Sequence, residues 1–214
     1  MKEDILEQIV DDYMQHRGYF TVHNVRFNPA KDHPDYVSNR DSVASDVDVV
    51  GFNPLEEGHK RVWVVSCKSW QPGFDATAQL RHALAPAKPG KKAGWQRYRE
   101  LFNPKWAEAF RMKIAALTGE TQFHYSIAVT SLRGNDEAWT THPTINQSLA
   151  GNPFSFLTLT EMWSGVIEAT TTTPAASEIG RLAQLLKAAR LTDANSPEPS
   201  RGNSGAPSAQ PHVE

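Results

Sequence analysis

The sequence predicts an α/β domain in which helices flank a mixed central sheet, and three patterns indicate this fold class. An amphipathic segment at residues 3–17 places apolar side chains at helical spacing. Runs rich in β-branched and aromatic residues follow at 19–27, 45–52 and 61–69. A helical pattern at 74–84 then precedes an apolar run at 122–132. The predicted order is therefore α-β-β-β-α-β.

The connections between these elements are marked by turn residues. The second and third strands are joined by FNPLEEGHK, which makes an antiparallel hairpin the simplest arrangement. Two prolines each at residues 28–40 and 85–94 predict that both segments are loops. Residues 98–117 have a helical pattern that is interrupted near Asn103 and Pro104.

The last part of the chain adds a strand and a helix to this core. Residues 154–159 (FSFLTL) predict the strand. Thr173 can cap the helix, Pro174 suits its first turn, and an apolar stripe follows. Beyond that helix the sequence is nearly devoid of large apolar groups. We therefore expect one domain at residues 1–191 and a disordered tail at 192–214.

Composition narrows the class of protein. Hydrophobic residues make up 39% of the chain and charged residues 21%, which is ordinary for a globular protein. The formal net charge is −2, so any affinity for nucleic acid must come from a local patch. The single cysteine excludes an intramolecular disulfide. The acidic start is not a secretion signal, and no run is long enough to span a bilayer, so a cytoplasmic protein without membrane contact is expected.

The predicted hairpin brings an acid and a lysine together. Side chains alternate along a strand, so Asp46, Asp48 and Val50 are expected on one face. Ser66 and Lys68 share a face of the next strand, with Cys67 on the other. The turn sets Asp48 roughly across from Ser66, with Lys68 about one pair further along. Such charges among apolar strands need partners or a bound ion.

This pair suits phosphodiester hydrolysis. A carboxylate can hold Mg²⁺, which polarises a phosphate and lowers the pKa of a bound water. A lysine can position that water and offset charge on the phosphate. The structural alternative is an edge strand with a wet face followed by the end of another strand.

Asp48 in DVDVVGF, followed by Lys68 in VWVVSCKSW, resembles the PD-(D/E)XK nuclease superfamily, which includes restriction endonucleases and Mrr-like enzymes. The resemblance covers residues 3 to about 132 and implies a restriction-endonuclease-like α-β-β-β-α-β core. It implies that Asp48 binds the metal and that Lys68 is catalytic. An acidic residue of the first helix often joins the metal site in that family, and Glu7 is the matching position.

One position departs from the family pattern. The second acid should stand two residues before the lysine, where this chain has Ser66, a weaker ligand without charge. Some restriction enzymes in the superfamily are similar and draw the acid from the following helix. That makes Asp75 the first substitute acid and Asp46 the second, while Gln79 matches a helix glutamine near the scissile phosphate. A solvated helix face is the alternative for Asp75 and Gln79, and Cys67 is expected to be a small core residue.

A basic stretch interleaved with aromatic residues follows at residues 81–113. It contains nine Lys or Arg residues against two acids. Such a segment can contact the phosphate backbone, and we expect the loop with Lys88, Lys91 and Lys92, together with Arg97, to touch DNA. The alternative is that the aromatics face the core and the cations are merely solvated.

The leading hypothesis is therefore a Mg²⁺- or Mn²⁺-dependent DNA endonuclease, with Asp48, Ser66, Lys68 and Gln79 as catalytic candidates. Metal-ligand candidates are Glu7, Asp46, Asp48 and Asp75. One alternative is a DNA-binding module on a weakened or inactive nuclease scaffold, because Ser66 replaces an acid. Another is a protein-interaction domain whose charged strand faces are wet surface. The prediction leaves a homodimer open.

Overall fold

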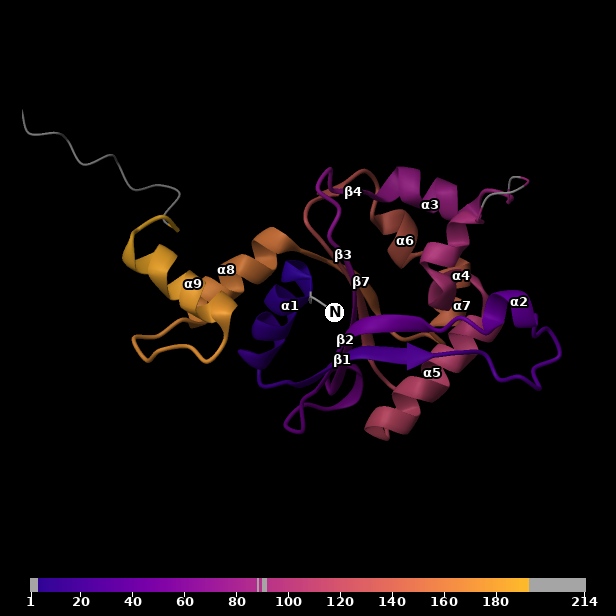
Figure 1. Ribbon diagram of the computed structural model, residues 1–214, viewed down its shortest axis with the longest axis horizontal. Coiled ribbons are helices and arrows are strands. Elements are labelled where there is room, and N and C mark those ends of the chain that lie inside the picture. Colours follow the sequence, from indigo (N-terminus) through magenta and orange to yellow (C-terminus); the bar gives the residue numbers. More distant parts are fainter. Residues whose placement is uncertain (1–3, 88, 90–91, 193–214) are drawn as a thin grey trace, which may run out of the picture.

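The fold, seen in a computed structural model, is built around a five-stranded mixed sheet (Figure 1). The structure describes residues 4–87, 89 and 92–192. The strands, in spatial order, are β1 (Phe20–Phe27), β2 (Ser45–Phe52), β3 (Val62–Lys68), β5 (His124–Val129) and β7 (Phe154–Thr158). The first three pair antiparallel, and β3, β5 and β7 pair parallel. The predicted fold class, strand order and hairpin are confirmed.

Helices cover both faces of the sheet (Figure 1). One face carries α1 (Ile5–Gln15), α8 (Leu159–Ala169) and α9 (Glu178–Ala188). The other carries α3 (Ala76–Leu84), α4 (Arg99–Phe102), α5 (Pro104–Thr118), α6 (Glu137–Thr140) and α7 (Pro143–Ser148). Shorter elements are α2 (Ser38–Asp41), η1 (Gly58–Lys60), η2 (Gly94–Arg97), β4 (Phe74–Asp75) and β6 (Leu132–Arg133). Each layer buries its own apolar cluster against the sheet.

The sequence pattern of α1 explains how it packs on the sheet. Its buried side chains recur at helical spacing and include Leu6, Val10 and Met14. Asp4 caps the helix by accepting a hydrogen bond from the Leu6 N–H. A side chain at Gly51 of β2 would meet Met14, since an added Cβ would lie 2.5 Å from the Met14 methyl carbon. The glycine therefore lets α1 approach β2 closely.

The structure corrects several predicted boundaries. The helix expected at 74–84 begins with β4, which pairs with β6, and becomes helical only at Ala76. The last helix is capped by Ser177 rather than Thr173, because the Ser177 hydroxyl accepts the Gly180 N–H. The expected loop at 28–40 contains α2.

The region after β5 holds three helices, α6–α8, that the sequence reading did not include. The proposed tail lies outside the described residues from residue 193 onward. Among the described helices, none has both the length and the apolar character needed to cross a bilayer. The cytoplasmic location stays a prediction.

The antiparallel part of the sheet opens into a fork. The β2–β3 ladder runs from Phe52 only to Val49, which faces Val65. Beyond that point β2 continues to pair with β1, and β3 continues to pair with β5 as far as Lys68. Strands β2 and β3 therefore separate at Asp48 and Ser66. We refer to this place as the β2–β3 fork.

The side chains of β2 do not alternate strictly between the two faces of the sheet near the β2–β3 fork. Asn24 of β1, which lies between the paired residues His23 and Val25, has a left-handed φ of 53°. Asparagine tolerates this conformation better than most residues. As a result Val47 and Val50 pack into the same apolar cluster, although an alternating strand would send them to opposite faces. The prediction that Asp46, Asp48 and Val50 share one face is therefore wrong, whereas β3 alternates as expected.

Candidate functional site

The β2–β3 fork is held together by side chains. The Asp48 carboxylate accepts the Cys67 backbone N–H at 2.5 Å, in place of the strand carbonyl that would otherwise pair there. Lys68 Nζ donates to Ser66 Oγ at 2.9 Å. The Lys68 ammonium and the Ser66 hydroxyl both act to lower the pKa of Asp48, so the three side chains lie close together. The structure thus links Asp48, Ser66 and Lys68 into one polar cluster at the open end of the sheet.

Burial controls the electrostatics of Asp48. Desolvation raises its pKa above the ordinary value, and the nearby charge of Asp46 raises it further. The Lys68 ammonium, the Cys67 N–H and the Ser66 hydroxyl act in the opposite direction but do not cancel the rise. In the folded protein the charged form of Asp48 is therefore destabilised, because its neighbours do not fully offset the loss of solvation.

Glu7 of α1 faces the same cluster. Burial raises the pKa of Glu7, and the charges of Asp48 and Asp4 raise it further, while His23 of β1 lowers it. The Ser69 hydroxyl donates to the carboxylate of Asp4, which ties the start of α1 to the end of β3. Glu7 and Asp48 are thus two acids that repel each other across the fork. A cation placed between them would relieve that repulsion.

A buried acid that the sequence did not predict also belongs to the site. Glu100 of α4 is 5% exposed and accepts a 2.5 Å hydrogen bond from the hydroxyl of Tyr125, a fully buried residue of β5. Burial raises the pKa of Glu100, which Lys68 lowers and Asp48 raises. Burial raises the pKa of Tyr125 well above its usual range, the Glu100 carboxylate adds to the rise, and Ser66 acts against it. Only the polar character of two residues in apolar surroundings could have indicated them in the sequence.

Gln79 of α3 lies at the border of the same cluster. Its side-chain oxygen accepts a hydrogen bond of 3.2 Å from the Tyr98 hydroxyl. The ring centroid of Tyr98 is 6.0 Å from Lys68 Nζ. Burial raises the pKa of Tyr98, so the phenol keeps its proton and acts as the donor. The structure therefore brings Gln79 near the lysine through Tyr98.

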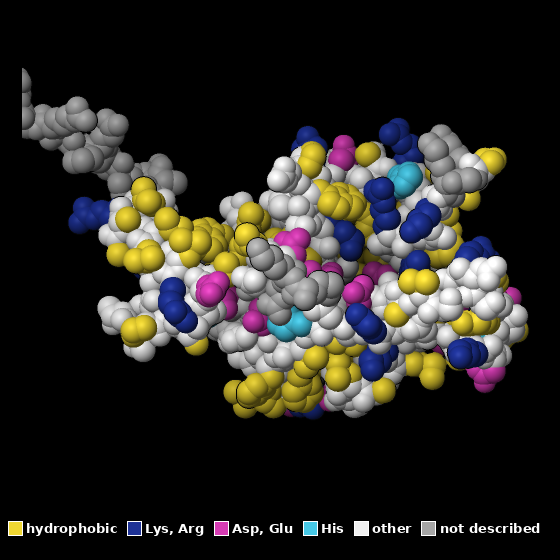
Figure 2. Space-filling view, in the orientation of Figure 1, with side chains coloured by type: hydrophobic (Ala, Val, Ile, Leu, Met, Phe, Trp, Pro, Cys, Tyr) yellow, Lys and Arg dark blue, Asp and Glu magenta, His cyan; other side chains and the backbone are white. Residues whose placement is uncertain are grey.

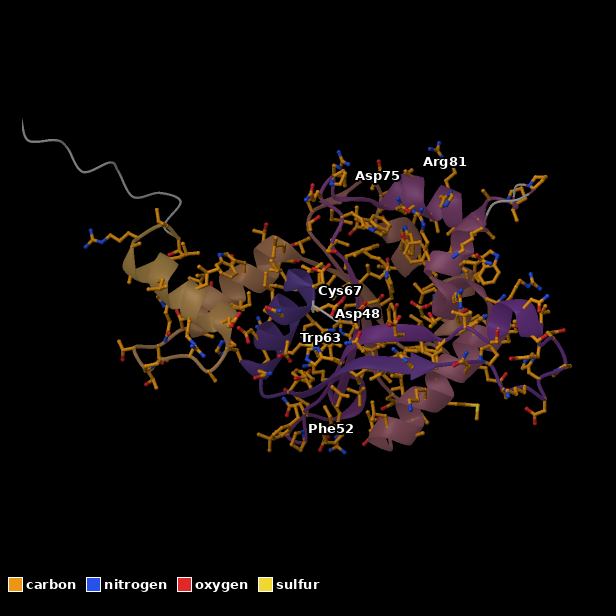
Figure 3. All side chains as sticks on the ribbon, in the orientation of Figure 1. Asp48, Phe52, Trp63, Cys67, Asp75 and Arg81 are labelled. Carbon is orange, nitrogen blue, oxygen red and sulfur yellow. The ribbon has the colours of Figure 1, made fainter. Side chains whose placement is uncertain are left out.

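Asp75 does not join the fork. Its carboxylate caps α3 by accepting the Ala78 N–H at 2.8 Å. Figure 3 shows Asp75 at the start of α3, apart from Asp48 and Cys67 at the centre of the molecule. The helix after β3 therefore does not supply the missing acid through Asp75. Asp46 is exposed and acts on Asp48 only through its charge.

Cys67 occupies the position expected of a core residue. Its side chain packs against the apolar cluster under α1, on the opposite face from Ser66 and Lys68. Burial raises the pKa of its thiol well above the usual range, and the carboxylates of Asp48 and Glu7 add to the rise. A thiol held in its protonated form is a poor nucleophile.

The basic, aromatic stretch is partly structural. Tyr98, Trp106 and Phe110 are buried in the apolar cluster, as the structural alternative predicted for the aromatics. Lys105 is buried and Arg99 lies over the Trp106 ring, with 4.5 Å between the Arg99 Cζ atom and the ring centroid. Lys105 is taken up by its ion pair with Asp41, and Arg99 also donates to the Val43 carbonyl.

Two of the four predicted DNA contacts can be located. Lys92 and Arg97 are exposed, and the Arg97 guanidinium lies 5.7 Å from the centroid of the Trp70 ring. Lys88 and Lys91 lie outside the described residues. Figure 2 shows acidic side chains at the centre of this face and Lys and Arg side chains over the half that carries α2–α5. Basic surface therefore borders the acidic centre.

The oxygen atoms at the fork can be compared with the ligands that a divalent cation requires. Within residues 4–87, 89 and 92–192, no three His, Cys, Asp or Glu side chains form a metal-binding group. Mg²⁺ keeps several waters and commonly uses one or two carboxylates together with phosphate oxygens of a substrate. Glu7 and Asp48, two hard oxygen donors with raised pKa values, fit that requirement.

Fold and site define an α/β protein with an acid–lysine cluster at the open end of a mixed sheet. No protein-family model, curated protein or solved structure matches the chain. The relation to the PD-(D/E)XK superfamily therefore stays a prediction that rests on Asp48, Lys68 and the order of elements.

Proposed function

We propose that this protein is a metal-dependent DNA endonuclease that hydrolyses phosphodiester bonds at the β2–β3 fork. The observation that carries the proposal is that Asp48, Ser66 and Lys68 meet where two strands separate, with Lys68 bonded to the Ser66 hydroxyl and Asp48 to the Cys67 N–H. In an acid–lysine pair with a purely structural role, we would expect the ammonium to contact the carboxylate directly. Here the amine donates to a hydroxyl instead, and the acid keeps a raised pKa.

Glu7 and Asp48 would hold Mg²⁺ or Mn²⁺, which when bound polarises a phosphate and makes water acidic. The chain's own groups provide the remaining functions. Ser66 holds the Lys68 ammonium in place by accepting its hydrogen bond. Lys68 can then orient water toward the phosphorus and offset charge on the phosphate oxygens. Gln79, fixed by Tyr98, can hydrogen-bond a phosphate oxygen or water at the border of the site.

The substrate side of the proposal rests on charge. Lys92 and Arg97 are exposed beside η2, and the sequence adds Lys88 and Lys91 to the same stretch. Cations in such a patch bind the sugar-phosphate chain regardless of sequence. They would bring a polyanion to a site that is itself acidic.

The proposal is tested by incubating plasmid, linear duplex, single-stranded and branched DNA with the protein and Mg²⁺ or Mn²⁺. We expect cutting that chelation, Asp48→Asn or Lys68→Met abolishes. Asp136→Asn and Lys113→Met change exposed residues of the same types and should leave cutting intact. Cutting that persists in both Asp48→Asn and Lys68→Met would refute the proposal.

The second candidate is a DNA-binding module on a nuclease-like scaffold, and Ser66 is the observation that favours it. Its hydroxyl is already engaged by Lys68 and brings no negative charge to a metal. This alternative predicts salt-dependent DNA binding that Mg²⁺ does not alter, without cleavage. Ser66→Glu should then create metal-dependent cutting, whereas cutting by the unaltered protein would end this alternative.

A further inference from the structure

Trp70 is a half-buried aromatic residue that stands two positions beyond Lys68 in the chain. Two residues of backbone span at most about 7 Å, so Trp70 lies close to the lysine. Its ring stacks on the fully buried Phe74, with 5.6 Å between the ring centroids and 10° between the ring planes. Part of the ring is therefore anchored in the core, and the exposed part borders the β2–β3 fork.

An exposed cation accompanies this ring. The Cζ atom of Arg97 lies 5.7 Å from the centroid of the Trp70 ring, whereas Arg99 lies 4.5 Å from that of Trp106. Among the ion pairs of the described residues, none includes Arg97. The Arg97 guanidinium is thus loosely held and can bind an anion without giving up a structural ion pair.

The backbone that carries this ring and this cation is fixed. The Trp70 carbonyl accepts the Thr130 hydroxyl at 2.6 Å and the Gly73 N–H at 2.9 Å. The turn η2, which carries the arginine, packs tightly on α3, since a Cβ added at Gly94 would lie 2.0 Å from the His82 carbonyl oxygen. Groups held in this way lose little conformational freedom when a ligand binds.

A ring beside a cation matches a nucleotide whose base is unpaired. Every base has an aromatic face that can stack on a ring, and a guanidinium binds the adjoining phosphate. A base inside a duplex is already stacked within it, so it offers such a face only after leaving the stack. Lys92 adds a second exposed cation to the same segment. Figure 2 shows hydrophobic surface beside Lys and Arg side chains near β4, above the acidic centre.

We propose that Trp70 and Arg97 form a platform for single-stranded DNA, on which the indole stacks with an unpaired base and the guanidinium holds the adjoining phosphate. A strand bound on this platform passes beside Lys68. The platform therefore names the substrate class of the site, which is DNA with unpaired nucleotides where it is cut. The cutting rests on the proposed nuclease function, whereas the binding of the strand does not.

The binding test compares an oligothymidylate of about 12 nucleotides, within the range of known single-strand sites, with a duplex of the same length. Fluorescence anisotropy is measured with chelator present to prevent cutting. Trp70→Ala should raise the Kd of the single strand about 5- to 150-fold, the loss of one stacked base, and leave that of the duplex unchanged. Trp163→Ala removes a half-buried tryptophan of α8, on the opposite face of the sheet, and should change neither Kd. Trp70→Phe keeps an aromatic face and should retain most of the affinity.

An abasic oligonucleotide separates stacking from a structural effect of the substitution. It lacks the bases but keeps the phosphates, so the unaltered protein should bind it more weakly than the oligothymidylate. Trp70→Ala should lose most of that preference, and Trp70→Leu, which keeps an apolar side chain against Phe74, replaces it if the alanine variant does not fold. Equal binding of the two strands by the unaltered protein would overturn the platform. An undiminished preference in the Trp70 variants would overturn it as well.

The platform and the nuclease proposal fail separately. If the unaltered protein cuts no DNA while its preference for the oligothymidylate depends on Trp70, the nuclease proposal fails and the platform stands. If the protein cuts DNA and Trp70→Ala neither weakens single-strand binding nor slows the cutting of single strands, the nuclease stands and the platform is overturned.

Discussion

Two aspartate–lysine pairs of this protein have opposite designs. In the first, Lys105 Nζ contacts Asp41 at 2.5 Å, and the two residues are 8% and 2% exposed. Lys105 also donates to the Asp35 carbonyl, and Asp41 accepts the Val37 N–H. In the second, Lys68 donates to the Ser66 hydroxyl, and among the ion pairs of the described residues none includes Asp48.

The pKa values record the difference. Burial alone would raise the pKa of Asp41, but hydrogen bonds from Lys105 and the Val37 N–H take it below its ordinary value. For Asp48 burial prevails, and the pKa stays raised despite Lys68. The first pair is complete and fastens the segment before β2 to α5. The second is incomplete, which is the expected state of a site that receives a ligand.

The largest effect separates the two lysines. Lys105→Met leaves the Asp41 charge buried without its partner and should cost about 3–5 kcal/mol of unfolding free energy. Lys68→Met should cost less than about 1 kcal/mol, because Lys68 forms no ion pair with Asp48 and Asp48 keeps the Cys67 N–H. Urea unfolding monitored by circular dichroism measures both. Equal losses would show that the two pairs serve the same structural purpose.

A bound cation should stabilise only the second pair. With free Mg²⁺ at one hundred times its Kd, binding to the folded state adds about 2.7 kcal/mol to the unfolding free energy. Thermal melts with and without Mg²⁺ should show this gain in the unaltered protein and in Asp41→Asn. The gain should vanish in Asp48→Asn and shrink in Glu7→Gln. A gain of full size in Asp48→Asn would place the cation elsewhere.

Substitution of Asp48 should itself stabilise the metal-free protein. A raised pKa means that the folded state binds the proton more tightly than the unfolded state does. The stability that Asp48 contributes is therefore full below its ordinary pKa and is lost as pH rises through the folded value. Asp48→Asn removes this loss and should gain on the order of 1 kcal/mol at neutral pH, the size of a typical stabilising substitution.

The pH dependence that Asp41 adds to stability is opposite to that of Asp48. Its lowered pKa contributes stability above the ordinary value, and this contribution is lost as pH falls through the folded value. The difference in unfolding free energy between the unaltered protein and each Asn variant, measured from acidic to neutral pH, should therefore change in opposite directions for Asp41 and Asp48. A pH profile of Asp48→Asn that coincides with that of the unaltered protein would contradict the assignment.

The sequence predicted the second pair but not the first. Periodicity defined β2 and β3, and hairpin geometry then placed Asp48 roughly across from Ser66, one residue beyond Val49–Val65, the last pair of the ladder. Contact between Asp41 and Lys105 depends on how the segment before β2 lies on α5. No local pattern encodes that arrangement, so Lys105 was counted among the cations of a basic stretch.

Glu100 could not be predicted for the same reason. Its contact with Tyr125 of β5 joins residues that lie 25 positions apart in the sequence, and no local pattern encodes such a contact. Asp75 was misread because an aspartate before a helix serves equally well as a cap or as a site acid, and the Ala78 N–H decided the matter. One missed element did leave a local signal. Thr158 and Glu161 form a capping box at the start of α8, and the T-x-x-E spacing was present in the sequence.

The smallest effect concerns a cation that belongs to neither pair. Lys92 is exposed, and if it meets one phosphate, Lys92→Ala should reduce the slope of log K against log salt by about 0.9 for duplex DNA. Lys113→Ala removes an exposed lysine of α5 and should leave that slope unchanged. Fluorescence anisotropy over a series of salt concentrations, with chelator present to prevent cutting, measures both variants. Identical slopes for Lys92→Ala and Lys113→Ala would show that Lys92 contributes no charge to DNA binding. The DNA would then have to bind away from η2.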